Sequence, residues 1–163
     1  MSHSAYRRFA DFYSANTGKL WRYLVRIGAD RSLAEDLAQE AFLRWSTSRA
    51  AGWEEERARA YLFTIATRLL TDWWRRHRRH AAWEEAGHAE LSCEIEASPL
   101  LGGRAWLGLA KRHRQLLWLA YVEEFTHEEI AGIAGIGAKS VRVLLSRARD
   151  SLATALTKED EDA

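Results

Sequence analysis

Residues 126–149 read THEEIAGIAGIGAKSVRVLLSRAR, and their apolar spacing predicts two helices joined by a sharp turn. The residues expected to face inward are Ile130, Ala131 and Ala134 on the first helix and Val141, Leu145 and Ala148 on the second. Gly135 lies where the chain must turn, since glycine tolerates a positive φ, and Ile136 is expected to fill the gap between the helices. The stretch therefore predicts a helix-turn-helix.

The second helix of this stretch is expected to carry an exposed basic face. Its outward residues are Lys139, Ser140, Arg142, Val143, Ser146 and Arg147. Cations and hydroxyls on one helix face suit a helix that reads the major groove of DNA. The alternative is an ordinary α-hairpin with a solvated basic face. We favour DNA recognition because the small Ala131, the glycine turn and a capping box at Thr126 and Glu129 accompany that face.

Helical spacing continues over most of the remaining chain, and no segment shows sustained strand alternation, so the expected fold is all-α. Helices are predicted at about 6–27, 32–46, 54–79 and 104–121. Ser32 and Glu35 are expected to form a capping box at the start of the second of these.

The periodicity weakens after residue 80, where the sequence turns acidic and contains the single proline, Pro99. We therefore expect two small helical domains, residues 1–80 and 106–157. A flexible acidic linker, residues 81–105, joins them, and an acidic tail, residues 158–163, follows.

The net charge of +1 predicts no nucleic-acid partner by itself, but the charge is unevenly distributed. Residues 68–80 hold five arginines and one aspartate, which makes this segment a second basic surface. The single cysteine, Cys93, is consistent with a reducing compartment. No apolar run is long enough to span a membrane and no signal peptide begins the chain, so we expect a cytoplasmic protein without direct membrane insertion.

Three stretches of the sequence, in order, resemble extracytoplasmic-function (ECF) sigma factors, the small promoter-specificity subunits of bacterial RNA polymerase. Residues 34–45, AEDLAQEAFLRW, resemble their region 2.2. Residues 59–76 resemble regions 2.3 and 2.4, and residues 107–149 resemble region 4. The run FTIA at 63–66 leans toward the iron-uptake branch. The resemblance implies a non-enzymatic protein that binds core RNA polymerase and promoter DNA.

The resemblance also implies three contact surfaces. Asp36, Gln39 and Glu40 would dock the core polymerase; the alternative is a solvated helix start stabilised by the helix dipole. The residues that would meet the −10 element are Arg59, Arg68, Trp74, Arg75, Arg76 and Arg79. The outward face at 139–147 would recognise the −35 element.

Several details of these surfaces come from the same resemblance. The loop at 49–57 corresponds to the place where the family holds a flipped-out base. Trp73 is expected in the core, with Trp74 as the exposed indole. Arg68 replaces a frequent asparagine, and Val143 replaces a polar or basic residue, so the promoter sequence does not carry over from relatives.

Control of such a protein is expected to need a separate anti-sigma factor, because no sensor domain is evident; the alternative is control by synthesis alone. A second functional reading is a stand-alone helix-turn-helix regulator that binds DNA without polymerase. A third is a zinc module built from His77, His80, His88 and Cys93. Their spacing fits no common zinc pattern, and arginines surround two of the histidines, so no metal or other cofactor is expected.

Overall fold

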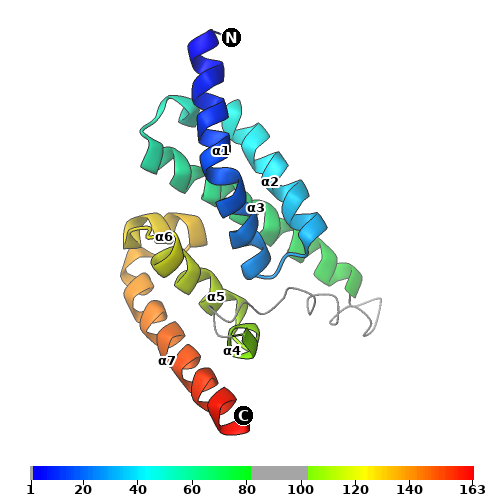
Figure 1. Cartoon of the computed structure of the whole chain (residues 1–163), viewed down its shortest axis with the longest axis vertical. Helices are drawn as coiled ribbons and strands as arrows, with labels where there is room; N and C mark the ends of the chain where they lie inside the picture. The colour runs from blue at the N-terminus through cyan, green and yellow to red at the C-terminus, as the bar shows by residue number, and fades with distance from the viewer. Residues whose placement is uncertain (1, 82–102) are drawn as a thin grey trace. The chain divides into compact units, whose positions relative to one another are not determined.

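The computed structural model describes residues 2–81 and 103–163, with side chains in those ranges apart from 79–81. The helices are α1 (His3–Arg26), α2 (Arg31–Ser46), α3 (Glu55–Ala81), α4 (Gly103–Leu107), α5 (Lys111–Leu117), α6 (His127–Ala134) and α7 (Ala138–Asp162). A 3₁₀ turn, η1 (Arg49–Gly52), follows α2, and a π-helical turn, η3 (Trp118–Val122), follows α5. The described ranges contain no strand, which confirms the all-α prediction (Figure 1).

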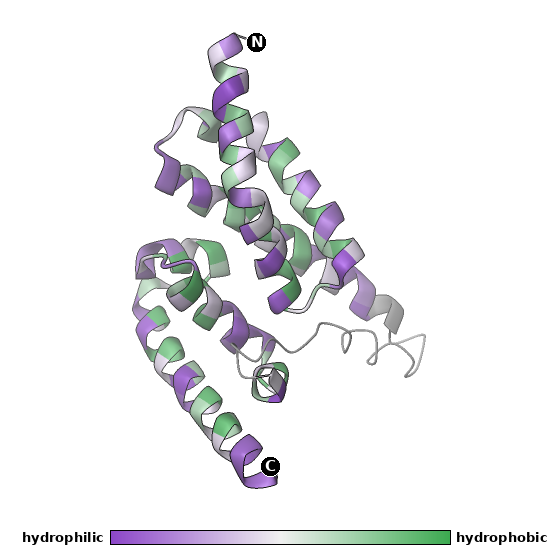
Figure 2. Ribbon diagram, in the orientation of Figure 1, coloured by the Kyte–Doolittle hydropathy of each residue, from purple (hydrophilic) through white to green (hydrophobic). Residues whose placement is uncertain are grey.

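The chain divides into two compact units, one built from α1 to α3 and the other from α4 to α7. Of the linker predicted at 81–105, residues 82–102, with Cys93 and Pro99, lie outside the described residues. The ends of the predicted linker are helical: Ala81 is the last residue of α3, and residues 103–105 belong to α4. The helices are amphipathic, with hydrophilic and hydrophobic residues alternating along each of them (Figure 2). Each unit therefore has a small apolar core of its own.

In the first unit, the core forms where three helices meet. Leu20 and Leu24 of α1 are fully buried, as are Leu62 and Leu70 of α3. Trp45 of α2 stacks on Phe12 of α1 with 4.1 Å between ring centroids. Aromatic area thus supplies much of the burial that a three-helix unit needs.

A buried hydrogen bond also joins α1 to α3. The Thr67 hydroxyl donates to the Phe63 carbonyl at 2.7 Å, so the Tyr23 hydroxyl, also 2.7 Å from Thr67 Oγ1, is the donor in that pair. Both side chains are buried, and the bond satisfies polar groups that are cut off from water.

The start of α2 differs from the prediction. The N-cap is Asp30, whose carboxylate accepts from the Leu33 N–H at 2.8 Å. Ser32 therefore lies inside the first turn, and the predicted capping box with Glu35 is wrong. Gly28, with φ 123°, turns the chain between α1 and α2.

The single helix predicted at 104–121 is broken. A turn at 108–110 separates α4 from α5 and changes the phase of the apolar residues. Leu107 is 39% exposed, whereas Trp106 and Leu109 are buried.

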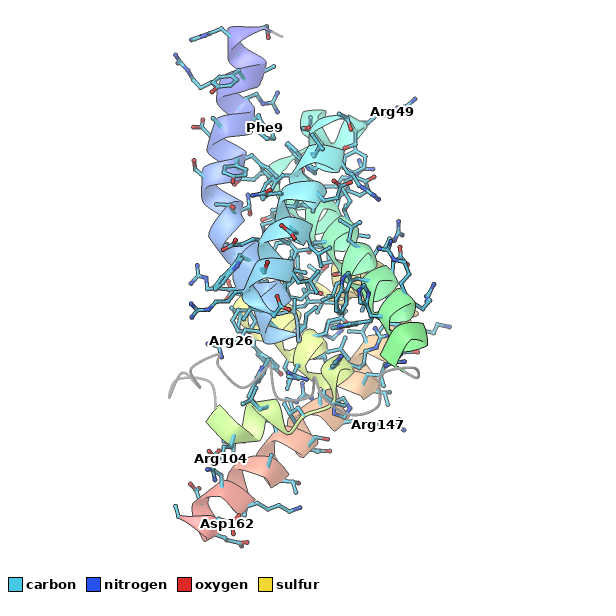
Figure 3. The ribbon with its side chains drawn as sticks, turned by 90° about the vertical axis from the view of Figure 1, so that its right-hand side faces the viewer. Phe9, Arg26, Arg49, Arg104, Arg147 and Asp162 are labelled. Atoms are coloured by element: carbon cyan, nitrogen blue, oxygen red, sulfur yellow. The ribbon has the colours of Figure 1, made fainter. Side chains whose placement is uncertain are left out.

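Residues 158–162, which we expected as an acidic tail, continue α7 to Asp162. The Glu159 carboxylate accepts from the backbone N–H groups of Arg104 and Ala105, each at 3.3 Å. Arg104 and Asp162 mark the start of α4 and the end of α7 in Figure 3, which shows these two helices side by side. A carboxylate at a helix N-terminus satisfies free N–H groups, so Glu159 caps α4.

Candidate nucleic-acid interface

The start of α6 and the turn that follows α6 have the predicted capping box and glycine. Thr126 Oγ1 accepts from the Glu129 N–H at 3.2 Å, and Glu129 Oε1 accepts from the Thr126 N–H at 3.0 Å. This confirms the capping box at the start of α6. Gly135 ends α6 in the left-handed conformation with φ 68°, so α7 begins after a sharp change of direction.

The inner faces of α6 and α7 pack together. Ile130, Ala131 and Ala134 are buried on α6, and Val141, Leu145 and Ala148 are buried on α7, as predicted. Ile136 is half-buried between the helices. Two further contacts were not predicted from the sequence. Ile133 is also buried, and Arg112 of α5 donates to the Ala134 carbonyl at 2.7 Å.

The outer face of α7 is open to solvent. The exposed residues are Lys139, Ser140, Arg142, Val143, Ser146 and Arg147, as predicted from the spacing. None of the three cations in this set forms an ion pair within residues 2–78 and 103–163. Their positive charge is therefore available to an anionic partner.

The polar set on α2 formed by Asp36, Gln39 and Glu40 is only partly exposed. Asp36 and Gln39 are exposed, whereas Glu40 is half-buried and paired with Arg44 Nε at 2.7 Å. Leu43, three residues after Glu40, is 61% exposed. Residues three apart share a helix face, so this face carries an apolar group that sequence reasoning missed.

Along α3, the predicted −10 residues differ in exposure. Arg68, Arg75 and Arg76 are exposed, but Arg75 lies 3.8 Å from the Asp72 carboxylate. Arg59 is half-buried, with its guanidinium 5.8 Å from the centroid of the Phe63 ring. The side chain of Arg79 lies outside the described ones.

The two indoles of α3 do not divide as predicted, because Trp73 and Trp74 are both half-buried. Trp73 stacks on His77 with 3.8 Å between ring centroids, and His77 Nδ1 lies 2.8 Å from the Trp73 carbonyl oxygen. The stack covers part of one face of Trp73.

A further cation–aromatic cluster lies at the start of α3. The Arg57 guanidinium is 3.9 Å from the Trp53 ring centroid, and Trp53 meets Tyr61 edge-on at 5.3 Å. Arg57 and Tyr61 are four residues apart on α3 and share a helix face. Trp53 precedes the helix in an extended conformation, so sequence spacing alone does not place its ring beside them.

No group of His, Cys, Asp or Glu side chains that could hold a metal ion exists among the residues that were placed. His80, His88 and Cys93 of the zinc alternative lie outside the side chains described. Of the described helices, none combines the length and the apolar character that a membrane span requires.

Comparison with known proteins covers both units. Residues 12–80 match sigma-70 region 2, and residues 104–152 match sigma-70 region 4. The ECF RNA polymerase sigma factor SigL of Mycobacterium tuberculosis is 30% identical over 142 residues, which cover 80% of this chain and 78% of that protein. The RNA polymerase sigma-E factor of Streptomyces avermitilis is 30% identical over 167 residues, covering 100% of this chain and 93% of that one.

A solved structure shares the fold. It is the co-crystal structure of the sigma factor RpoE in complex with the anti-sigma factor NepR from Bartonella quintana. The likeness has a TM-score of 0.70 at 20% identity and covers 91% of this chain and 96% of that one. With both sigma regions in order and relatives that match along most of their length, the chain belongs to the ECF family of RNA polymerase sigma factors.

Proposed function

We propose that this chain binds core RNA polymerase and directs it to promoters, without catalysing a reaction itself. The observation that carries the proposal is a region 4 whose recognition helix presents Lys139, Arg142 and Arg147 to solvent without acidic partners among the described residues. The protein would act in the cytoplasm, where polymerase and DNA meet.

Run-off transcription tests this proposal. Purified chain and core polymerase should together yield a transcript from promoters mapped by genome-wide binding, and core alone should not. A stand-alone regulator would instead bind its DNA site without core. Core binding with no promoter-dependent transcript would contradict the proposal.

We propose Asp36, Gln39 and Glu40 as the docking surface for core polymerase. Asp36 and Gln39 are exposed, and the open apolar side chain of Leu43 follows on the same helix. A charged rim around an apolar contact is a usual composition for a protein interface. The Glu40–Arg44 pair reduces the charge that Glu40 offers, which leaves Asp36 as the principal acidic group.

We propose two separate DNA surfaces. On α3, cations and half-buried indoles would hold the melted −10 element, because cations bind phosphates and aromatic rings stack on unpaired bases. These residues are Arg59, Arg68, Trp74, Arg75, Arg76 and Arg79. On α7, the outward face at 139–147 would read the −35 element in the major groove.

We also propose an anti-sigma partner. The neighbouring Bartonella quintana sigma factor was crystallised with one, and this chain exposes the acidic motif of α2, which such a partner could cover. Affinity purification from uninduced native cells, followed by crosslinking, is the test. Recovery of polymerase subunits alone, with target transcripts that follow the abundance of the chain, would indicate control by synthesis.

The finer assignment to the iron-uptake branch rests on the run FTIA at 63–66. It predicts that the mapped promoters precede iron-uptake genes and that their transcripts rise in iron-poor medium. Promoters unrelated to iron would contradict it.

A further inference from the structure

A hydrogen bond at one edge of the second unit joins two exposed side chains. Arg149 Nη1 on α7 donates to the Tyr121 hydroxyl on η3 at 2.8 Å, across 28 residues of sequence. Tyr121 is 58% exposed, and Arg149 is also exposed. Neither residue belongs to the surfaces proposed above.

The position of Arg149 relates it to the DNA-reading face. It follows Arg142 by seven residues, which is nearly two helical turns, so both point to the same side of α7 about 10 Å apart along the axis. Ser146 lies on the same side between them. Arg149 therefore extends the basic face toward the C-terminal end of α7.

The Tyr121 hydroxyl, which accepts the hydrogen bond from Arg149, carries no charge. A tyrosine hydroxyl is a neutral acceptor, so it orients the guanidinium and leaves its charge in place. On α2, by contrast, Arg44 is paired with the Glu40 carboxylate. No carboxylate pairs with Arg149 in the described part of the chain. The remaining N–H groups of the planar guanidinium match the geometry of a phosphate.

We infer that Arg149 is a further DNA contact of the helix-turn-helix, an anchor for a backbone phosphate beside the −35 element, and that Tyr121 is its positioning residue. The inference rests on the proposed function. A phosphate contact fixes the register of a recognition helix and carries no sequence information. Arg149 should therefore add affinity equally on all −35 sequences.

The test uses holoenzyme assembled from the full chain and core polymerase, with a promoter duplex identified by genome-wide binding as the probe. Arg149→Gln should lower affinity about tenfold and reduce the slope of log affinity against log salt by about one. The loss should be equal on duplexes with an intact and a substituted −35 element. Lys158→Gln, which removes another exposed cation of α7, is the matched control and should leave the slope unchanged.

Two variants test the positioning role. Tyr121→Phe keeps the ring and removes the hydroxyl; it should weaken DNA binding alone but not in the Arg149→Gln background. Arg149→Lys keeps the charge and should preserve the salt slope at reduced affinity. Urea unfolding of each variant should match the parent chain, because both side chains are exposed.

An unchanged salt slope in Arg149→Gln would overturn the inference, as would losses from Tyr121→Phe and Arg149→Gln that simply add. Loss of affinity for core without loss of DNA binding would show that this edge docks protein. If the parent holoenzyme makes no promoter-dependent transcript, the result contradicts the proposed function itself. A parent holoenzyme that does make the transcript confines any negative result with the variants to the role of Arg149.

Discussion

Tyr23 and Thr67 illustrate how one buried pair supports the first unit. Tyr23→Phe removes the hydroxyl that donates to Thr67 Oγ1 and leaves that buried oxygen without its donor. We expect the free energy of unfolding to fall by about 1 kcal/mol. Urea titration followed by circular dichroism measures it. Tyr6→Phe is the control, because Tyr6 is 63% exposed, and an equal loss in both variants would contradict the prediction.

Asp36 is the residue on which the polymerase-docking proposal depends most. Asp36→Arg should weaken core binding by about tenfold or more, because it reverses the charge of the principal acidic group on the proposed docking surface. The fold should remain intact, since the side chain is exposed. Competition for core against a labelled parent chain measures the affinity. Glu35→Arg, the same change at the exposed neighbouring position, should have the smaller effect, and equal effects would show that the face is assigned wrongly.

Much of the site could be read from the sequence at this scale, because exposure on a regular helix follows spacing. All six outward residues of α7 are exposed, from Lys139 to Arg147. The exposure of Trp74 could not be read in the same way. A large indole is rarely fully exposed, and its burial depends on tertiary contacts that helical spacing does not show. The Tyr121–Arg149 bond joins distant residues, and spacing alone cannot reveal such a contact.

The turn of the helix-turn-helix offers a matched pair of glycines at the scale of one element. Gly135 has φ 68°, and no atom lies within 4 Å of an added Cβ, so alanine there brings backbone strain without a clash. We expect Gly135→Ala to lower the free energy of unfolding by about 1–2 kcal/mol. Gly132 lies inside α6, and no atom lies within 4 Å of an added Cβ there either. Gly132→Ala should raise the free energy of unfolding by about 0.5–1 kcal/mol. Thermal unfolding of both variants checks the opposite signs, and a shared sign would refute the argument.

Element boundaries were predictable where a local motif sets them. The capping box of α6 involves four successive residues, and its sequence pattern was sufficient. At α2, Asp30 caps the helix in place of the predicted Ser32, because the Asp30 carboxylate accepts from the Leu33 N–H. The break between α4 and α5 had no proline to signal it. The cap of α4 comes from Glu159, far along the chain, so the local pattern could not show where α4 begins.

At the scale of the whole molecule, the two proposed DNA surfaces should fail in different ways. Lys139→Ala and Arg142→Ala should impair −35 recognition, with a lost base contact costing about 1–3 kcal/mol. Arg75→Ala and Arg76→Ala should slow opening of the −10 element and lower the salt slope by about one per lost phosphate contact. Stopped-flow measurement of promoter opening distinguishes the two steps.

Premelted bubble DNA provides the control for this division. It removes the opening step, so it should rescue the Arg75 and Arg76 variants more than the Lys139 and Arg142 variants. Equal rescue of both pairs would refute separate roles for α3 and α7.

The division into two helical units followed from the loss of periodicity after residue 80 together with the acidic charge there. The family followed from three short motifs in order. The promoter sequence and the inducing signal could not be predicted from the amino-acid sequence, because each depends on the molecules that bind the exposed surfaces. Val143 on α7 is an example: the structure shows that its side chain is exposed, but the base pair that it would contact depends on the DNA sequence.

The cap that Glu159 places on α4 has a consequence for synthesis on the ribosome. Residues up to 81 contain α1, α2 and α3, so the first unit can close while translation continues. The carboxylate that accepts from the N–H groups of Arg104 and Ala105 belongs to Glu159, which is synthesised 55 and 54 residues later. We therefore expect the first unit of a nascent chain to fold before α4 is capped, so that the two units of this sigma factor fold one after the other during synthesis.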